Sequence, residues 1–374
     1  MRNLALALLL CGIGAAPSMA QSPSTSSDAT WTFGGFADFG YLFDPNHPPD
    51  RRTRSRGTSF HVNELSLNMA GISAARTPTD SSRWGSELAI HAGKDDEVFA
   101  LSPTAPALDA APWLRHLGRA NVSYLAPAGN GLLLQAGIFA SPIGYDSLYA
   151  KDNLSYTRPW TADFTPYLLM GLSAAYPVST RLTMTGFVVN GYWHLANANR
   201  APNAGMQLSY ASTPTLTIKQ TMFVGSHQER TEFAYWRFLS DTIIERRTKR
   251  WIAALNAQVA TERVDDATGV RAWWLAAQWP IHWRSSGAWS VTARPEIAWD
   301  SGGRWTVFEQ TVAAFTGTID YRRSLRGATA LVRLEYRTDS STGPQGGFFS
   351  SEAGRLTPTQ HLLIAALILT FERR

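Results

Sequence analysis

The chain has 374 residues, of which 44% are apolar, 11% aromatic and 17% charged, and its formal net charge is +5. The charged fraction is below the roughly 25% usual in soluble domains, while the apolar and aromatic content excludes a disordered or collagen-like chain. The single cysteine, Cys11, excludes a disulfide scaffold and a cysteine-based zinc site. No lysine-rich run or nucleic-acid-binding motif is present, so we expect no nucleic-acid partner.

The N-terminus has the pattern of a cleaved export signal. Arg2 provides a positive start, and the apolar run from Leu4 to Ile13 is too short to span a bilayer. Small residues follow at Ser18 and Ala20, which predicts cleavage between Ala20 and Gln21. We therefore expect a signal peptide over 1–20 and one exported domain over 21–374.

From residue 31 onward the pattern predicts β-strands. Segments of about ten residues alternate between apolar and polar side chains and are separated by Gly, Pro, Asn, Asp and Ser clusters. In 291–300, for example, Arg294 and Glu296 share one face while Ile297 and Trp299 occupy the other. We predict about 16 strands, with 14 as the alternative count. Their ranges are 31–43, 59–74, 83–93, 117–126, 131–140, 167–176, 181–190, 205–211, 215–226, 236–246, 250–262, 269–280, 287–299, 306–321, 327–339 and 360–371.

The connections between these strands alternate in length. Short turns are expected at 127–130, 177–180, 212–214, 248–249 and 323–326. Long loops are expected at 44–58, 94–116, 141–166, 191–204 and 340–359, with two short exceptions at 263–268 and 300–305. Short periplasmic turns and long outer loops are typical of transmembrane β-barrels.

Aromatic residues at the strand ends support the same topology. Such girdles form at both membrane interfaces because the rings have one apolar and one hydrated end. The predicted periplasmic girdle is Tyr124, Tyr176, Tyr210, Trp279 and Tyr321, and the predicted outer girdle is Tyr41, Phe223, Trp299 and Tyr336. The predicted fold is therefore an all-β, antiparallel transmembrane barrel in the outer membrane of a Gram-negative bacterium, with both ends periplasmic. A soluble all-β protein is the alternative.

Several motifs are similar to those of a known family. They are GIFASPIGYD at 137–146, NLSYTR at 153–158, NELSLN at 63–68 and EYRTD at 335–339, together with Pro166, Gly171 and Asn190-Gly191. In this order they resemble the OmpL-like family of outer-membrane β-barrel porins over most of the mature chain. The resemblance implies a barrel and a pore, but it supplies no catalytic residue and no defined solute. Phe371, near the end of the last strand, resembles the signal that the barrel assembly machinery reads, although three charged residues follow it.

The sequence contains no signature of an enzyme. There is no Gly-x-Ser-x-Gly, no His-Glu-x-x-His, no phosphate-binding Gly-x-x-x-x-Gly-Lys and no Cys-His metal spacing. We expect no catalytic residue, no metal and no cofactor. Two alternatives to a channel stay open: a lipase- or protease-like barrel with its site assembled from separate strands, and a structural or adhesive barrel with a closed lumen.

Charged residues on the strands are predicted to face the lumen. An Arg or Lys that faces lipid costs about 2–4 kcal/mol at the midplane, whereas the lumen of a wide barrel is wet. We expect these inward charges to stay hydrated, to brace the wall and to set the transverse field that solutes cross. The candidate pore-lining residues on the wall are Arg294, Glu296, Arg333, Glu335, Arg337 and Asp339.

The loop 141–166 is the third long loop on the outer side. The resemblance to sixteen-stranded porins implies that it folds into the lumen and sets the bore, and a solvated surface loop is the alternative. Its candidate pore-lining residues are Asp146, Lys151, Asp152, Arg158 and Asp163. Acidic and basic candidates nearly balance, which predicts a transverse field and only a weak ion preference.

The predicted function is a passive diffusion channel for small hydrophilic solutes. The basic cluster Arg51, Arg52, Arg54 and Arg56 in the first loop either meets lipopolysaccharide phosphates or is simply solvated. The expected partners are outer-membrane lipid and lipopolysaccharide, the solutes, the barrel assembly machinery and two further copies of the chain, since sixteen-stranded porins often form homotrimers.

Overall fold

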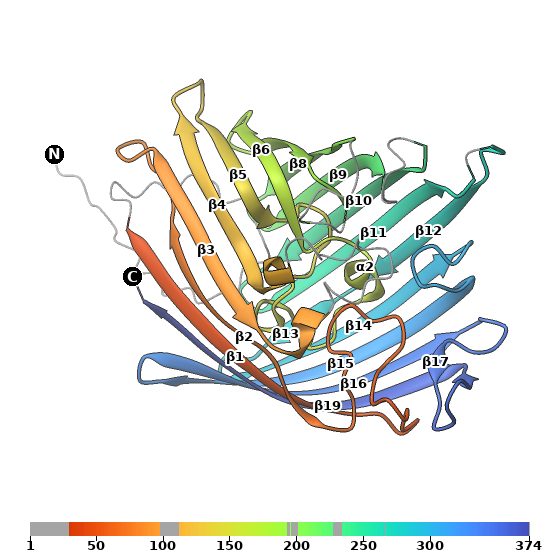
Figure 1. The fold of residues 1–374 in the computed structure, drawn as a ribbon. Coiled ribbons are helices and arrows are strands. Elements are labelled where there is room, and N and C mark those ends of the chain that lie inside the picture. The colour runs from red at the N-terminus through yellow and green to blue at the C-terminus, as the bar shows by residue number, and fades with distance from the viewer. Residues whose placement is uncertain are drawn as a thin grey trace.

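The computed structural model describes residues 30–97, 112–192, 195, 201–226, 234–265 and 267–373. The predicted signal peptide and its cleavage site at Ala20 and Gln21 lie outside these residues. Within them the chain forms one closed antiparallel β-barrel (Figure 1). No helix in the described part of the chain is long and apolar enough to cross a membrane.

Each strand of the barrel pairs with the strands before and after it in sequence. The first eleven are β1 (Trp31–Phe43), β2 (Leu65–Arg76), β3 (Trp84–Ala92), β4 (Leu117–Ala126), β5 (Leu132–Ala140), β6 (Leu168–Pro177), β7 (Leu182–Val189), β8 (Asn203–Thr213), β9 (Leu216–Ser226), β10 (Trp236–Arg247) and β11 (Trp251–Arg263). The others are β12 (Arg271–Gln278), β13 (Ile281–Arg284), β14 (Trp289–Asp300), β15 (Gln310–Leu325), β16 (Ala328–Ser341) and β19 (Thr359–Arg373). Antiparallel pairing of β1 with β19 closes the barrel.

The barrel has the predicted sixteen strands. The sheet contains 17 strand segments, but β12 and β13 are one strand interrupted at Trp279 and Pro280, since both segments pair with β11 and with β14. A proline has no N–H to donate to a sheet, which explains the break. The strand predicted at 236–246, with the least regular pattern, is β10.

Two predicted strand starts are wrong. The strand expected from residue 59 begins at Leu65, because 59–64 belong to the first outer loop: Thr53 N–H donates to Phe60 O and Val62 N–H to Arg51 O. The strand expected over 306–321 is β15, which begins later, at Gln310, so the connection before it is longer than predicted. A two-stranded hairpin, β17 (Phe348–Phe349) with β18 (Leu356–Thr357), lies in the last outer loop.

The two faces of the wall are sorted as predicted. On β16, Leu334 is 55% exposed while its neighbours Arg333 and Glu335 are 1% and 4% exposed. The same alternation of exposed apolar and buried side chains runs along β14 and β19. Because the exposed positions are apolar, this outer surface is suited to lipid.

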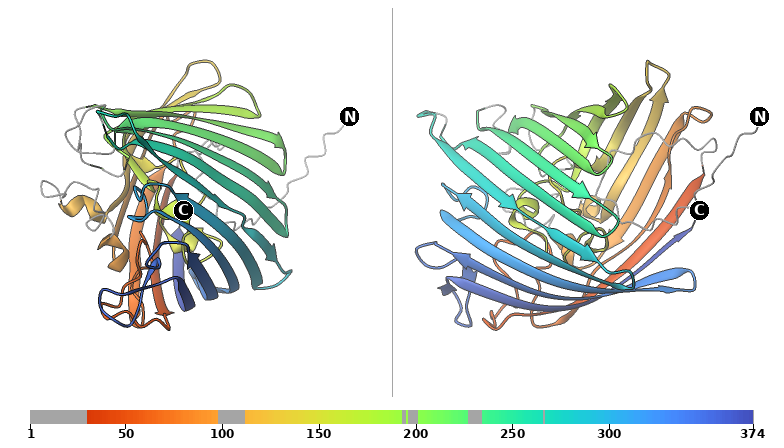
Figure 2. Two further views of the ribbon diagram at one scale, coloured as in Figure 1. Left: turned by 90° about the vertical axis from the view of Figure 1, so that its right-hand side faces the viewer. Right: turned by 180° about the vertical axis from the view of Figure 1, so that it is seen from behind.

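Aromatic pairs mark the end of the barrel that carries the short turns. Trp84 packs on Tyr124 and Trp289 on Tyr321, with ring centroids 4.9 and 4.8 Å apart. One residue of the predicted outer girdle is wrong: Phe223 is 1% exposed and points inward, where it packs on Tyr192. Phe33 pairs with Arg373, so the start of the first strand, β1, lies beside the end of the last strand, β19 (Figure 2).

Candidate functional site

The connection between β5 and β6 lies inside the barrel. It carries two short helices, η4 (Ala150–Asp152) and α2 (Trp160–Asp163), and we call residues 141–167 the inner loop. Figure 1 shows α2 enclosed by the strands, and α2 contacts β11, β12 and β14. At its start, the carbonyl of Pro142 accepts hydrogen bonds from Gln207 on β8 and Thr221 on β9, at 2.6 and 2.9 Å. The inner loop therefore occupies the lumen, as the resemblance implied.

Glu335 on β16 holds the middle of the inner loop. Its carboxylate accepts hydrogen bonds from the backbone N–H groups of Tyr156 and Thr157, at 2.5 and 2.9 Å, and from the Thr157 hydroxyl. Thr318 on β15 donates a further bond, at 2.8 Å. A short irregular segment has backbone donors with no ladder partner, and this carboxylate satisfies two of them.

Arg337, at the next inward-facing position of β16, joins two carboxylates of the wall. Its guanidinium donates to Glu296 at 2.8 Å and to both oxygens of Asp339 at 2.8 and 2.7 Å. Glu296 also accepts the backbone N–H of Trp160, and Asp339 accepts the indole N–H of the same residue, at 2.9 and 2.8 Å. Arg294 donates to Glu296 and to the Thr157 carbonyl. The wall and α2 are thus one charge-paired network.

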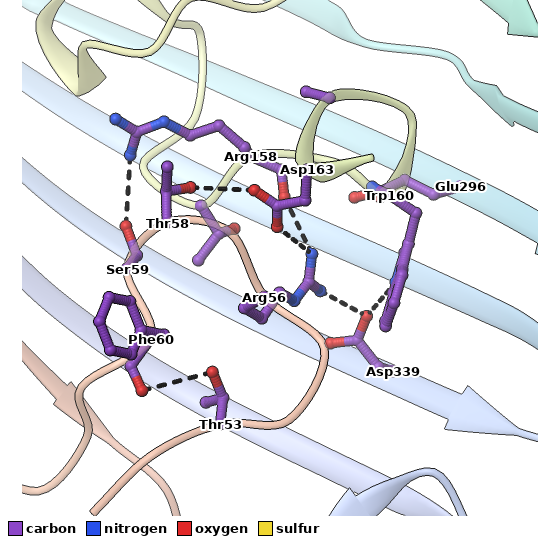
Figure 3. Close-up of polar contacts among 12 residues, drawn as sticks. Thr53, Arg56, Thr58, Ser59, Phe60, Arg158, Trp160, Asp163, Glu296 and Asp339 are labelled. Carbon is purple, nitrogen blue, oxygen red and sulfur yellow. Dashed lines mark hydrogen bonds and ion pairs between the residues drawn. The ribbon is translucent and has the colours of Figure 1, made fainter. Parts of the chain in front are cut away.

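The first outer loop, residues 44–64, reaches down to this network (Figure 3). Arg56 donates to Asp163 at 3.2 Å and to Asp339 at 2.9 Å, and its guanidinium lies 4.3 Å from the centre of the Trp160 ring. Arg54 lies over the ring of Phe308. The hypothesis that the whole basic cluster faces lipopolysaccharide or solvent is therefore wrong for Arg56, whose side chain is 4% exposed and pairs with two carboxylates inside the barrel.

Two of the predicted inner-loop residues are buried between the inner loop and the first outer loop. Arg158, which is 1% exposed, donates to the carbonyls of Leu148 and Tyr156 and to the hydroxyl of Ser59. Asp163, which is 2% exposed, accepts hydrogen bonds from Arg56, Thr58 and Tyr167. Burial raises the pKa of the Asp163 carboxyl, and the Arg56 guanidinium opposes that rise. These two side chains fix the conformation of the inner loop.

The six predicted wall residues point inward, but they are not hydrated. Their exposed fractions lie between 0 and 4%, because the inner loop covers them. Removing charges from water costs several kcal/mol per ion unless they are paired and hydrogen-bonded, and every one of the six has such a partner: Arg294, Glu296, Arg333, Glu335, Arg337 and Asp339. The expectation that these charges stay in contact with water is wrong, and bracing is the role that the geometry supports.

The opposite wall, formed by β3 to β9, has a different lining. Short polar side chains point inward there, among them Ser123, Gln135, Ser173 and Thr185, and they line a cavity of about 150 Å³. Gln135 donates to Asn121 at 2.8 Å, and Arg119 pairs with Glu87 at 2.9 Å. Sequence reasoning missed the uncharged residues of this lining, because polar side chains without charge give a weaker alternation signal than charges do.

A larger cavity of about 510 Å³ lies between the inner loop and the strands from β4 to β10. Three of the predicted residues of the inner loop line it: Asp146, Lys151 and Asp152. Its other charged side chains come from the strands and are Arg119, Lys219, Glu245 and Arg247. Pro214 and Thr215, in the short turn between β8 and β9, also line it, so the cavity extends toward the end of the barrel that carries the short turns.

A closed barrel of this size, with an apolar outer surface and a polar interior, belongs to the class of outer-membrane β-barrels. The model of the family described as "Putative beta-barrel porin-2, OmpL-like" matches residues 30–371, and the chain belongs to this family. The protein is accordingly an outer-membrane porin, as the resemblance of its motifs indicated. No curated protein matches the chain.

Solved structures of other outer-membrane proteins share the fold at low sequence identity. The anion-selective porin from Comamonas acidovorans has a TM-score of 0.57 and 9% identity, covering 92% of this chain and all of that one. The outer-membrane channel DcaP of Acinetobacter baumannii has a TM-score of 0.54 and 10% identity, with 95% and 100% coverage. OmpT of Vibrio cholerae in its trimer form has a TM-score of 0.52 and 9% identity, with 92% and 100% coverage.

Proposed function

We propose that this porin is a passive, non-enzymatic diffusion channel whose path runs along β3 to β9, beside the inner loop. The observation that carries the proposal is the cavity of about 510 Å³ left between the inner loop and this wall, lined by charged and polar side chains. Polar linings keep such a passage hydrated, which suits small hydrophilic solutes. Asp146, Lys151 and Asp152 are the predicted inner-loop residues that line this path.

Planar-bilayer recording of the refolded protein tests the proposal. A channel gives stepwise current increments in KCl, and swelling of liposomes in sugars of increasing size then gives the size limit of the pore. Detergent buffer and heat-denatured protein are the controls. A folded, membrane-inserted barrel without conductance would contradict the proposal and favour a barrel with a closed lumen.

We also propose that the channel is a homotrimer embedded in lipid and lipopolysaccharide, inserted by the barrel assembly machinery. The trimer form of Vibrio cholerae OmpT, which has the same fold, supports the stoichiometry by analogy. Native mass spectrometry of the detergent-solubilised protein tests it: three chains per particle are expected, and a monomer at all concentrations would contradict it.

A further inference from the structure

Lys219 lines the large cavity and makes no direct ion pair among the described residues. It lies on β9 opposite Ser209 of β8 and Ile243 of β10, and its side chain lines the cavity of about 510 Å³. No hydrogen bond to its Nζ and no carboxylate oxygen within 4 Å occurs among the described residues.

The other cations around the cavity are already paired. Arg119 pairs with Glu87, Lys151 with Asp152 and Arg247 with Glu245, at distances of 2.9, 2.8 and 2.9 Å.

The carboxylates nearest to Lys219 accept hydrogen bonds from other groups. Glu245 accepts from Arg247 and from the Tyr145 hydroxyl. Asp241 accepts from the Gly144 N–H and from the side-chain amides of Asn256 and Gln258. On the inner loop, Asp146 accepts a bond from Gln278 at 2.6 Å. Glu245 and Asp241 therefore attract Lys219 without contacting it, and Lys219 is the cation of the described cavity lining whose Nζ has no direct carboxylate partner.

The lining beside Lys219 is partly apolar. Ile143, Leu168, Pro214 and Ile243 share the cavity with it. A cation beside an apolar part of a cavity lining fits an organic anion, because the charge fixes one end of the solute and the apolar surface receives the other. A cavity of this size is within the range of sites that hold small organic molecules, about 300–1,000 Å³.

We propose that this cavity is a binding station for small carboxylates with an apolar body, and that Lys219 is the cation that holds the carboxylate. The proposal rests on the channel function proposed above and makes it specific. It also replaces the sequence-based expectation of a weak ion preference. The charged side chains of β14 and β16 neutralise one another beneath the inner loop, so the charges that solutes can reach decide the ion selectivity.

Reversal potentials in a tenfold KCl gradient test this station. The wild type is expected to prefer chloride, and Lys219→Gln is expected to lower the chloride-to-potassium permeability ratio roughly twofold to fivefold, by removing one charge from a narrow, poorly screened passage. Lys219→Arg keeps the preference. Lys249→Gln, in the exposed turn between β10 and β11, is the matched control with no expected effect.

Sodium benzoate is the probe for carboxylate binding. Added on the side of the short turns, it is expected to reduce the chloride current of the wild type and of Lys219→Arg, and to leave Lys219→Gln unaffected. A wild type that does not conduct would overturn the channel function itself. A conducting wild type whose selectivity or benzoate block is the same in Lys219→Gln would overturn the binding station and leave the channel function intact.

Discussion

The two halves of the barrel wall differ in their inward-facing residues and in whether the inner loop covers them. The half formed by β10 to β16, β19 and β1 carries long charged side chains, and the inner loop covers them so fully that Arg337 and Asp339 are 0% exposed. The half formed by β3 to β9 carries mostly short polar side chains with a few charged ones, such as Arg119 and Lys219, and together with the Glu245 end of β10 it borders the open cavities. The first half holds the loop in place, and the second leaves room for solutes.

This difference shows what charge in a porin strand signifies. Long charged side chains are needed where the wall must supply hydrogen-bond partners to the irregular backbone of the inner loop. The carboxylate of Glu335 accepts hydrogen bonds from two consecutive backbone N–H groups in this way. The open wall needs no such bonds to the inner loop, and hydroxyl and amide groups line it together with charged side chains such as Arg119 and Lys219. Charges that bond to the inner loop therefore identify the covered wall, and the passage lies where the inner loop leaves the wall uncovered.

Breaking the covered wall is expected to have the largest effect on stability. Arg337→Ala leaves Glu296 and Asp339 buried without their shared partner, and removing one member of a buried ion pair typically costs about 3–5 kcal/mol. Urea unfolding in lipid vesicles measures the loss. Gln135→Ala on the open wall is the control and is expected to change the free energy of unfolding by less than about 1 kcal/mol. Equal free energies of unfolding for the two variants would contradict the claim that the charged network of the covered wall contributes more to stability than the open wall does.

A charge placed on the lipid-facing side of the covered wall is expected to have the next largest effect on stability. Leu334→Arg places a charge against hydrocarbon and is expected to cost about 2–4 kcal/mol if the site is near the midplane, because Leu334 is 55% exposed on the outer surface. Leu334→Ala is the matched control that removes the side chain without adding charge. Folding yields and unfolding free energies in vesicles report the difference, and unimpaired insertion of the arginine variant would mean that this face is not in lipid.

Loosening a single anchor of the inner loop is expected to have a smaller effect. Glu335→Gln weakens the acceptor for the amides of Tyr156 and Thr157, and a hydrogen bond to a charged group contributes about 1.5–3 kcal/mol. Amide hydrogen exchange of peptides covering the inner loop should accelerate roughly tenfold or more, since about 1.4 kcal/mol corresponds to a factor of ten. Ser173→Ala, on the open wall, should leave this exchange unchanged. Unaltered exchange in Glu335→Gln would show that the loop is held elsewhere.

The last of these predictions concerns pH and the contact between two outer loops. Asp95, in η1 (Lys94–Glu97), accepts the backbone N–H of Ser59 at 2.8 Å, and burial raises the pKa of its carboxyl from 3.8 to about 7. Between these pH values the folded chain keeps a proton that the unfolded chain has released, so this group adds stability as the pH falls from 8 toward 5. The melting temperature of the wild type relative to Asp95→Asn should therefore rise over this range. A difference that stays constant with pH would contradict the shifted pKa.

The number of strands and the side of each strand that faces the lumen were predictable, because both follow from the local alternation of apolar and polar residues. Each strand repeats the two-residue period, and the cost of charge in lipid fixes which face of β16 turns inward. The position of β10 was predictable for the same reason, even with a poor pattern. The start of β2 was not predictable from the sequence. Residues 59–64 alternate between apolar and polar side chains as a strand does, but their backbone forms its hydrogen bonds within the first outer loop.

The site was predictable only in part, since it depends on contacts between segments far apart in sequence. The inward direction of Arg333 and Arg337 followed from the pattern, yet their burial arises from the inner loop, whose path no periodicity encodes. Arg56 reaches Asp339 across 283 positions of sequence, which no local pattern could reveal. Lys219 was overlooked because β9 carries a single charge, and a lone charge gives no alternation to recognise.

Accessibility of single cysteines to a thiol reagent during channel recording tests the central claim most directly. The chain's only cysteine is Cys11, before the predicted cleavage site, so an introduced thiol is the one that reacts. Ser173→Cys on the open wall is expected to react with a bulky, water-soluble methanethiosulfonate reagent and to reduce the current in steps. Thr318→Cys on the covered wall, where Thr318 is 2% exposed, is expected to stay unmodified with its current unchanged. Rapid modification and block at position 318 with none at 173 would place the solute path on the other wall and contradict this account.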